Sequence, residues 1–224
     1  MASRHVLILY YSLTQQTPRV LKHIDEGLKA AGHTTEWKAI DPIDKYPLPI
    51  GRMQFLWINA KLWAGLDLNP RLMPMEFEPA KYDHIILGFQ TWHLEPSFPM
   101  NAFLDASMSS MLSGKKVTLV QTCRNRWSRA QRIVIDKVLR RGGRVVSAYV
   151  LSNPDGHLLP TLHYLWNGKD PDPGTKMADR VGKDFAFEEK DVATARTFGD
   201  KLAIWLDKDE FPPRAEWTVV NNQE

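Results

Sequence analysis

Near its amino end the sequence reads Val6-Leu7-Ile8-Leu9-Tyr10-Tyr11-Ser12-Leu13-Thr14-Gln15-Gln16-Thr17, an apolar run that passes directly into a hydroxyl-rich turn. A short apolar run with β-branched and aromatic members is typical of a buried strand. The helical pattern that begins at Pro18 places free backbone N–H groups and a positive dipole end beside the turn. Together with the hydroxyls of Ser12, Thr14 and Thr17, these groups predict a site for a phosphate monoester. The alternative is an ordinary Ser/Thr turn that caps the helix.

Strand and helix patterns alternate along the rest of the chain. Apolar residues recur at helical spacing from residue 17 to Gly32, which is the expected end of the first helix. Further strands are expected at 33–40, 84–90, 115–121 and 144–151, and further helices at 53–68, 99–112, 127–142 and 192–205. Five strands that alternate with helices predict an α/β fold, with a parallel sheet covered by helices on both faces.

The chain is expected to form a single domain over residues 1–224. Two stretches depart from the alternation, and we interpret the first, about 41–79, as an insertion that holds one helix. The second, about 153–189, is too long for a simple loop and is interpreted as an irregular lid segment beside the site. The last residues, about 211–224, are expected to be a loose tail.

Three turns follow predicted strands, at residues 12–17, 90–96 and 121–127. Because parallel strands end at the same edge of a sheet, we expect these turns to lie together, where ligands of such sheets bind. Trp92 follows a strand end between the polar residues Thr91 and His93, which favours a ligand contact for its ring. A core aromatic residue is the alternative.

The composition excludes several classes of protein. The 29 lysine and arginine residues nearly balance 26 aspartate and glutamate residues, and a net charge of +3 is too weak to indicate nucleic acid or a membrane surface. The single cysteine, Cys123, rules out an internal disulfide and a cysteine zinc cluster. The seven histidines lack metal-site spacing, and neither a signal peptide nor a membrane span is evident. We expect a cytoplasmic protein without a metal ion.

The motif Ser12-x-Thr14-x-x-Thr17 and the pair Thr91-Trp92 resemble the flavodoxin family. Residues 82–104, 122–127 and 157–169 look like a bacterial flavodoxin-like branch, the dialkylresorcinol condensing enzymes. This resemblance covers most of the chain. It implies a three-layer sandwich with strand order 2-1-3-4-5, bound flavin mononucleotide (FMN), and hydride transfer on a hydrophobic cyclic or aromatic compound, such as dehydrogenative aromatisation of a cyclohexanedione. The condensing activity is not supported, because the nucleophile–base constellation of a ketosynthase is missing from the sequence.

The resemblance also implies which residues hold FMN. The phosphate group is assigned to the first turn, residues Ser12, Leu13, Thr14, Gln15, Gln16 and Thr17. The flavin ring is assigned to the other two turns, residues Thr91, Trp92, His93, Thr122, Cys123, Arg124, Asn125 and Trp127. Trp92 is expected to stack on the ring, and Trp127 is either a wall of the site or a core residue. His93 is the candidate catalytic acid–base group, with an ordinary surface histidine as the alternative.

Gln15 departs from the flavodoxin pattern, which usually has glycine at this position because glycine allows a close approach or a positive φ. FMN binding is retained if Gln15 has a negative φ, and its amide would then add a donor. The alternatives are a scaffold that has lost its flavin and a flavodoxin-type electron carrier, although such carriers typically present acidic faces.

Two further features concern partners. A basic helix follows the fourth predicted strand, and it is either a solvated face or a surface that attracts phosphate or a reduced nicotinamide donor; its arginines are Arg124, Arg126, Arg129, Arg132, Arg140, Arg141 and Arg144. The segment 53–68 is apolar on nearly every side and either covers an apolar substrate or forms a homodimer contact. We therefore expect a small hydrophobic substrate, with NAD(P)H or a redox protein as electron partner.

Overall fold

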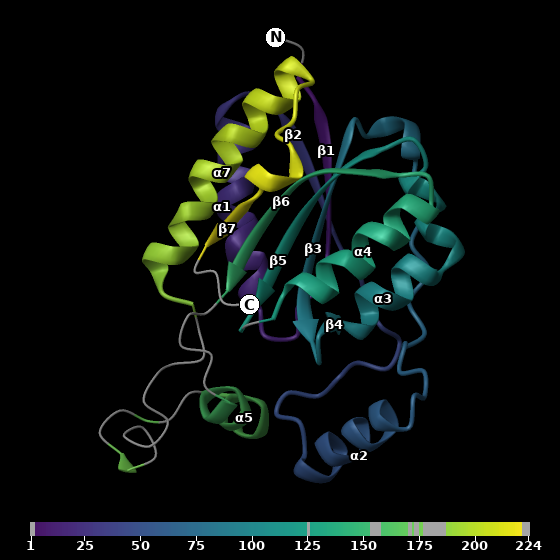
Figure 1. Ribbon diagram of the computed structural model, residues 1–224, viewed down its shortest axis with the longest axis vertical. Helices are drawn as coiled ribbons and strands as arrows, with labels where there is room; N and C mark the ends of the chain where they lie inside the picture. The colour runs from purple at the N-terminus through teal and green to yellow at the C-terminus, as the bar shows by residue number, and fades with distance from the viewer. Residues whose placement is uncertain are drawn as a thin grey trace.

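The computed structural model describes residues 3–124, 126–152, 158–169, 172, 175–176 and 187–220 (Figure 1). The five expected strands are present as β1 (His5–Tyr10), β2 (Thr34–Ala39), β3 (His84–Trp92), β5 (Lys116–Cys123) and β6 (Arg144–Ser152). They pair in parallel in the order β2-β1-β3-β5-β6, which is the expected order 2-1-3-4-5.

The number of strands was predicted wrongly, because within the described residues the sheet has seven. Strand β4 (Glu95–Pro96) pairs antiparallel with the end of β3, and β7 (Thr218–Val220) pairs in parallel with β6. A loose tail was expected from residue 211, and β7 corrects this expectation for residues 218–220. Both added strands are too short to show an alternating apolar pattern, so periodicity could not reveal them.

Helices cover both faces of the sheet (Figure 1). Helices α1 (Gln16–Ala30) and α7 (Glu189–Lys208) pack together on one face, where a Cβ on Gly27 would lie only 2.6 Å from the backbone of Gly199. On the other face lie α3 (Phe98–Asp105) and α4 (Ser128–Arg140). Alternate residues of each strand pack into two separate cores, one on each face of the sheet. Leu7, Leu9, Ile85 and Leu87 pack against α3 and α4. Val6, Ile8 and Ile86 pack against α1 and α7. Short 3-10 helices, η1 (Pro79–Lys81), η2 (Ser107–Leu112) and η3 (Arg214–Glu216), join these elements.

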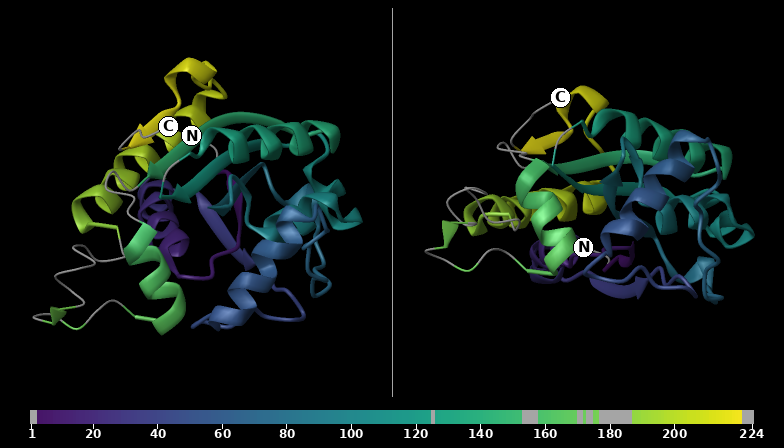
Figure 2. Two further views of the ribbon diagram at one scale, coloured as in Figure 1. Left: turned by 60° about the horizontal axis from the view of Figure 1, so that its bottom comes forward. Right: turned by 90° about the horizontal axis from the view of Figure 1, so that it is seen from below.

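The two irregular stretches each contain a helix, α2 (Arg52–Trp63) in the insertion and α5 (Leu158–Asn167) in the later segment. Both helices lie beyond the edge of the sheet at which β1, β3 and β5 end (Figures 1 and 2). They are joined where the Ile50 N–H donates to the carbonyl oxygen of Leu165 at 2.6 Å and where Phe55 packs edge-on against Trp166. None of the helices that the structure describes is long and apolar enough to cross a bilayer.

Candidate cofactor site

The first turn is tied to the ends of two neighbouring strands. Gln90, near the end of β3, accepts a hydrogen bond from the Leu13 N–H at 3.1 Å and donates one to the Thr14 hydroxyl at 2.7 Å. The Thr17 hydroxyl, in the first turn of α1, shares a hydrogen bond of 2.9 Å with the Thr122 hydroxyl at the end of β5. The structure therefore brings residues 12–17 together with the turns that follow β3 and β5, as the alternation of strands and helices predicted.

Ser12 differs from the other hydroxyl residues of this turn. The hydroxyls of Thr14 and Thr17 are buried and bonded to protein partners, whereas the Ser12 Oγ is buried and has no hydrogen-bond partner within the part of the chain that the structure describes. A buried polar atom that lacks a partner costs about 1–3 kcal/mol. Among the described residues, the start of α1 beside it has no side-chain cap hydrogen bond, and the N–H groups of a first helical turn have no partner within the helix. These features fit an acceptor-rich anion such as a phosphate.

Gln15 adopts the left-handed conformation, with φ of 59° and ψ of 11°, and it is the residue that precedes α1. Gln15 therefore does not have the negative φ under which FMN binding was expected to be retained. The backbone instead has the conformation that glycine provides in the flavodoxin pattern, and a glutamine side chain makes that conformation cost about 1–2 kcal/mol. Its amide reaches back to the Ser12 carbonyl oxygen at 3.4 Å. The neighbouring Gln16 side chain accepts hydrogen bonds from Arg19 and from the Phe187 N–H, while its amide nitrogen donates to the Thr14 carbonyl oxygen at 3.5 Å.

The second turn is a tight hairpin between β3 and β4. His93 and Leu94 both have positive φ, 48° and 70°, while Trp92 pairs with Glu95. Two central residues with positive φ define a type I′ turn, which normally selects asparagine and glycine. The structure thus holds two larger residues in a strained conformation at the strand end, a feature that clusters at functional sites. The His93 ring is solvent-exposed, yet desolvation by nearby protein atoms lowers its pKa below the usual 6.5.

Trp92 belongs to an aromatic cluster. Its ring lies nearly perpendicular to those of Tyr11, Tyr46 and Phe98, at centroid distances of 5.7, 5.5 and 5.3 Å. Tyr46 comes from the insertion, so this cluster links the insertion to the second turn. Burial raises the pKa of Tyr46 to about 12, which keeps the phenol neutral. The surroundings of Trp92 agree with the core alternative, and its stacking on a flavin stays a prediction.

The third turn contributes residues of different kinds. Thr122 is buried and bonded to Thr17, and Cys123 is buried with its thiol pKa raised to about 12 by desolvation, which leaves it unreactive. Arg124 is half-buried, and Asn125 lies outside the described residues. Trp127 lines a cavity of about 330 Å³, whose other lining residues include Arg132, Arg214 and Trp217.

Two glutamines that sequence reasoning missed hold the turns together. Gln90 binds the first turn, and Gln121 donates to the Thr91 hydroxyl at 2.7 Å and to the Trp127 carbonyl oxygen at 2.9 Å, which ties the second turn to the third. Both side chains are buried. The sequence did indicate these residues, because each glutamine lies near the end of an apolar strand. A polar side chain that is buried there needs a hydrogen-bond partner.

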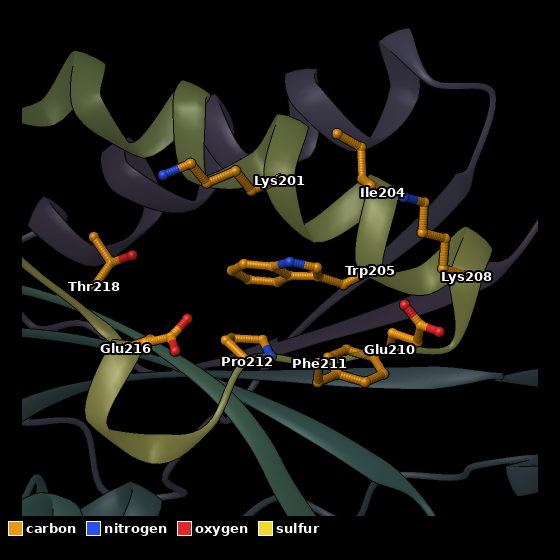
Figure 3. A pocket seen from close by; sticks show the side chains of 9 residues that line it. All are labelled: Lys201, Ile204, Trp205, Lys208, Glu210, Phe211, Pro212, Glu216 and Thr218. Carbon is orange, nitrogen blue, oxygen red and sulfur yellow. The ribbon is translucent and has the colours of Figure 1, made fainter.

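A second cavity lies away from the three turns. It measures about 510 Å³ and lies between the last turns of α7 and the segment before β7, with Trp205 above Pro212 in its wall (Figure 3). Phe211, which also lines it, stacks on His84 at the amino end of β3, so this cavity lies at the end of the sheet opposite the three turns. No group of histidine, cysteine or carboxylate side chains suited to a metal ion occurs among the described residues.

The sequence matches no protein-family model and no curated protein. Among solved structures, it is similar to a flavoprotein from Lactobacillus acidophilus in complex with FMN, with a TM-score of 0.53 and 19% identity over 66% of this chain and 93% of that one. It is also similar to a flavodoxin from the domain Archaea, with a TM-score of 0.51 and 13% identity over 91% of this chain and 99% of that one. The fold is flavodoxin-like. At these identities the similarity shows the fold alone.

Proposed function

We propose that this protein binds FMN at the three turns and acts as an oxidoreductase on a hydrophobic ring compound. The observation that carries the proposal is the buried Ser12 Oγ, which has no partner among the described residues and lies beside the uncapped start of α1. A phosphate oxygen would accept from this hydroxyl and from free N–H groups of the helix. The similarity to a flavoprotein structure that contains FMN supports the same assignment.

Residues of the chain would position the cofactor. Ser12 and the first turn of α1 would hold the phosphate, and the turns at 91–93 and 122–127 would flank the flavin ring. When bound, FMN supplies a two-electron acceptor for hydride. The lowered pKa of His93 keeps its imidazole neutral near pH 7, in the state that accepts a proton. We assign it the removal of a proton from the substrate.

The substrate class rests on the resemblance to the dialkylresorcinol condensing enzymes and on the apolar insertion. Dehydrogenation of a cyclohexanedione would transfer a hydride to FMN and a proton to His93, and the ring product would aromatise. NAD(P)H or a redox protein as electron partner and a cytoplasmic location belong to the same proposal. The basic arginines of α4 suit a phosphorylated nicotinamide donor.

The test is optical and direct. The purified full-length protein should be yellow or should become yellow on titration with FMN, with quenching of flavin fluorescence that saturates at one FMN per chain. Riboflavin, which lacks the phosphate, should bind at least about tenfold more weakly. A protein that stays colourless and leaves flavin fluorescence unchanged would refute the proposal and would indicate a scaffold that has lost its cofactor.

An electron carrier is the second candidate, because the chain is similar to an archaeal flavodoxin over 91% of its length. Anaerobic mixing of the FMN-loaded protein with a lipophilic cyclohexanedione separates the two candidates. Bleaching of the flavin absorbance with formation of the aromatic product supports the enzyme. Absence of bleaching, together with rapid exchange of electrons with a redox protein, supports the carrier.

A further inference from the structure

Most of the large apolar side chains that the described residues expose lie in one segment, residues 43–73. They are Ile43, Met53, Leu56, Trp57, Trp63, Leu66 and Met73. Trp57 is 62% exposed and Trp63 is 91% exposed, although tryptophan is usually among the more buried residues. This concentration is far beyond the scattered apolar residues of an ordinary surface and marks an interaction site.

Helix α2 explains why these residues gather. One side of the helix is half-buried through Phe55 and Ile58, and Phe55 packs edge-on against Trp166 of α5 at a centroid distance of 6.0 Å. The other side carries Met53, Leu56 and Trp57, which are equally apolar but exposed. A helix that is apolar on both sides needs a second apolar neighbour. Within the described part of the chain, nothing covers this second side.

The charged residues of helices α2 and α5 have one sign, whereas the loops of segment 43–73 also carry Asp44, which pairs with Arg71 at 3.5 Å, and Asp67. Helices α2 and α5 together carry no aspartate or glutamate, and their only charged residues are Arg52 and Lys61. Both cations lie over tryptophan rings: the Arg52 guanidinium is 5.3 Å from the centroid of Trp166, and the Lys61 ammonium is 5.2 Å from that of Trp57. Exposed tryptophan and leucine combined with cations is the composition of helices that lie in the interface of an anionic bilayer.

We propose that α2, supported by α5, docks the protein onto the surface of a membrane that contains anionic phospholipid. Met53, Leu56, Trp57 and Trp63 would enter the boundary between headgroups and acyl chains, and Arg52 and Lys61 would contact lipid phosphates. A second copy of the chain is the less suitable occupant. Symmetric contact through α2 would bring the same two cations together, and neither helix offers a carboxylate to pair with them.

The position of α2 and α5 suggests what membrane docking would do for the protein. Helices α2 and α5 lie beyond the sheet edge where the three turns meet, so a docked protein would hold those turns close to the bilayer (Figures 1 and 2). A lipophilic ring compound dissolved in the bilayer could then reach the site without crossing water. This last step rests on the proposed function, whereas the lipid binding does not.

Vesicle co-sedimentation of the full chain tests the docking. One set of vesicles contains phosphatidylcholine only, and the other contains equal amounts of phosphatidylcholine and phosphatidylglycerol. We expect at least about tenfold tighter binding to the anionic set, which high salt should weaken. The double variant Trp57→Ser/Trp63→Ser should lose most of the binding to both sets, and Lys61→Gln should lose mainly the preference for anionic lipid.

The matched control is Leu139→Ser/Ile204→Ser, which removes two exposed apolar side chains, 66% and 52% exposed, from α4 and α7 instead. This control should bind vesicles as the unmodified protein does. Absence of binding, or equal loss in both double variants, would overturn the proposal. So would a dimer in light scattering that only Trp57→Ser/Trp63→Ser dissociates, because that result assigns the surface to a second copy. Measurements without added FMN keep this test separate from the proposed function, since vesicle binding requires no cofactor.

Discussion

The hydroxyl of Thr17 in the first turn of α1 lies 2.9 Å from the hydroxyl of Thr122 at the end of β5, and both side chains are buried. The two residues are far apart in the sequence, and this single hydrogen bond joins the first and third turns. Thr17→Val or Thr122→Val alone leaves one buried hydroxyl unpaired and should lower the free energy of unfolding by about 1–3 kcal/mol. The double variant Thr17→Val/Thr122→Val should recover most of that loss, since both partners are then apolar. Urea unfolding of the four proteins measures the coupling, and additive losses would contradict it.

Ser12→Ala should affect stability and ligand binding in opposite directions. Without ligand, the buried Ser12 Oγ has no partner in the described part of the chain, so its removal should leave the midpoint of thermal unfolding unchanged or raise it. With ligand, the loss of a charge-assisted hydrogen bond should weaken FMN binding by about tenfold or more. Thermal scans and FMN titration of the same samples check both parts. A variant that loses stability but keeps FMN affinity would show that the hydroxyl serves the fold alone.

Gln15→Gly should stabilise the protein. The left-handed φ of 59° costs a glutamine about 1 kcal/mol more than a glycine, and the substitution removes that strain. Lys22→Gly is the matched control, because Lys22 is exposed in the interior of α1, where glycine should cost about 1 kcal/mol relative to ordinary residues. Chemical denaturation of both variants should therefore give changes of opposite sign. Destabilisation by Gln15→Gly would mean that the hydrogen bond from the Gln15 side-chain amide to the Ser12 carbonyl oxygen outweighs the strain.

The buried His84 predicts that stability falls in mild acid. Burial, assisted by the nearby Lys116 cation and opposed by Asp209 and Asp83, lowers the pKa of His84 from 6.5 to about 3. In the unfolded chain His84 is therefore protonated as the pH falls through about 6.5, whereas in the folded chain it stays neutral until about pH 3. This contribution to stability is complete above pH 6.5 and is lost as the pH falls, by about 2 kcal/mol at pH 5.

The measurement for His84 is the free energy of unfolding at pH 7 and at pH 5. His84→Gln keeps a polar partner for the Thr118 hydroxyl, which lies 2.7 Å from the His84 ring nitrogen, but does not titrate. The variant should be less sensitive to the change from pH 7 to pH 5 than the unmodified protein. Equal sensitivity would assign the acid response to other groups.

The sheet could be predicted because its central strands are long apolar runs, and each is followed by a helix with an apolar stripe. Strands β4 and β7 could not, since two or three residues show no period. The meeting of the three turns followed from the parallel arrangement alone. The hydrogen bonds that join the turns could not be predicted, because the partners of Gln90 and Gln121 depend on strand register and lie 76 and 30 residues away. The left-handed φ of Gln15 could not be predicted either, because the path of the backbone sets it. The contact of Tyr46 with Trp92 depends on the fold of an insertion that has no clear periodicity.

Strand β7 has a further consequence for the behaviour of the chain in the cell. Without it, β6 would be the outermost strand, and Tyr149, Val150 and Leu151 would offer an open row of backbone donors and acceptors to any extended peptide. Three residues of β7 occupy that row, and the Ser152 hydroxyl also donates to the carbonyl oxygen of Val220. A segment that contributes little to the core thus protects the protein against edge-to-edge aggregation.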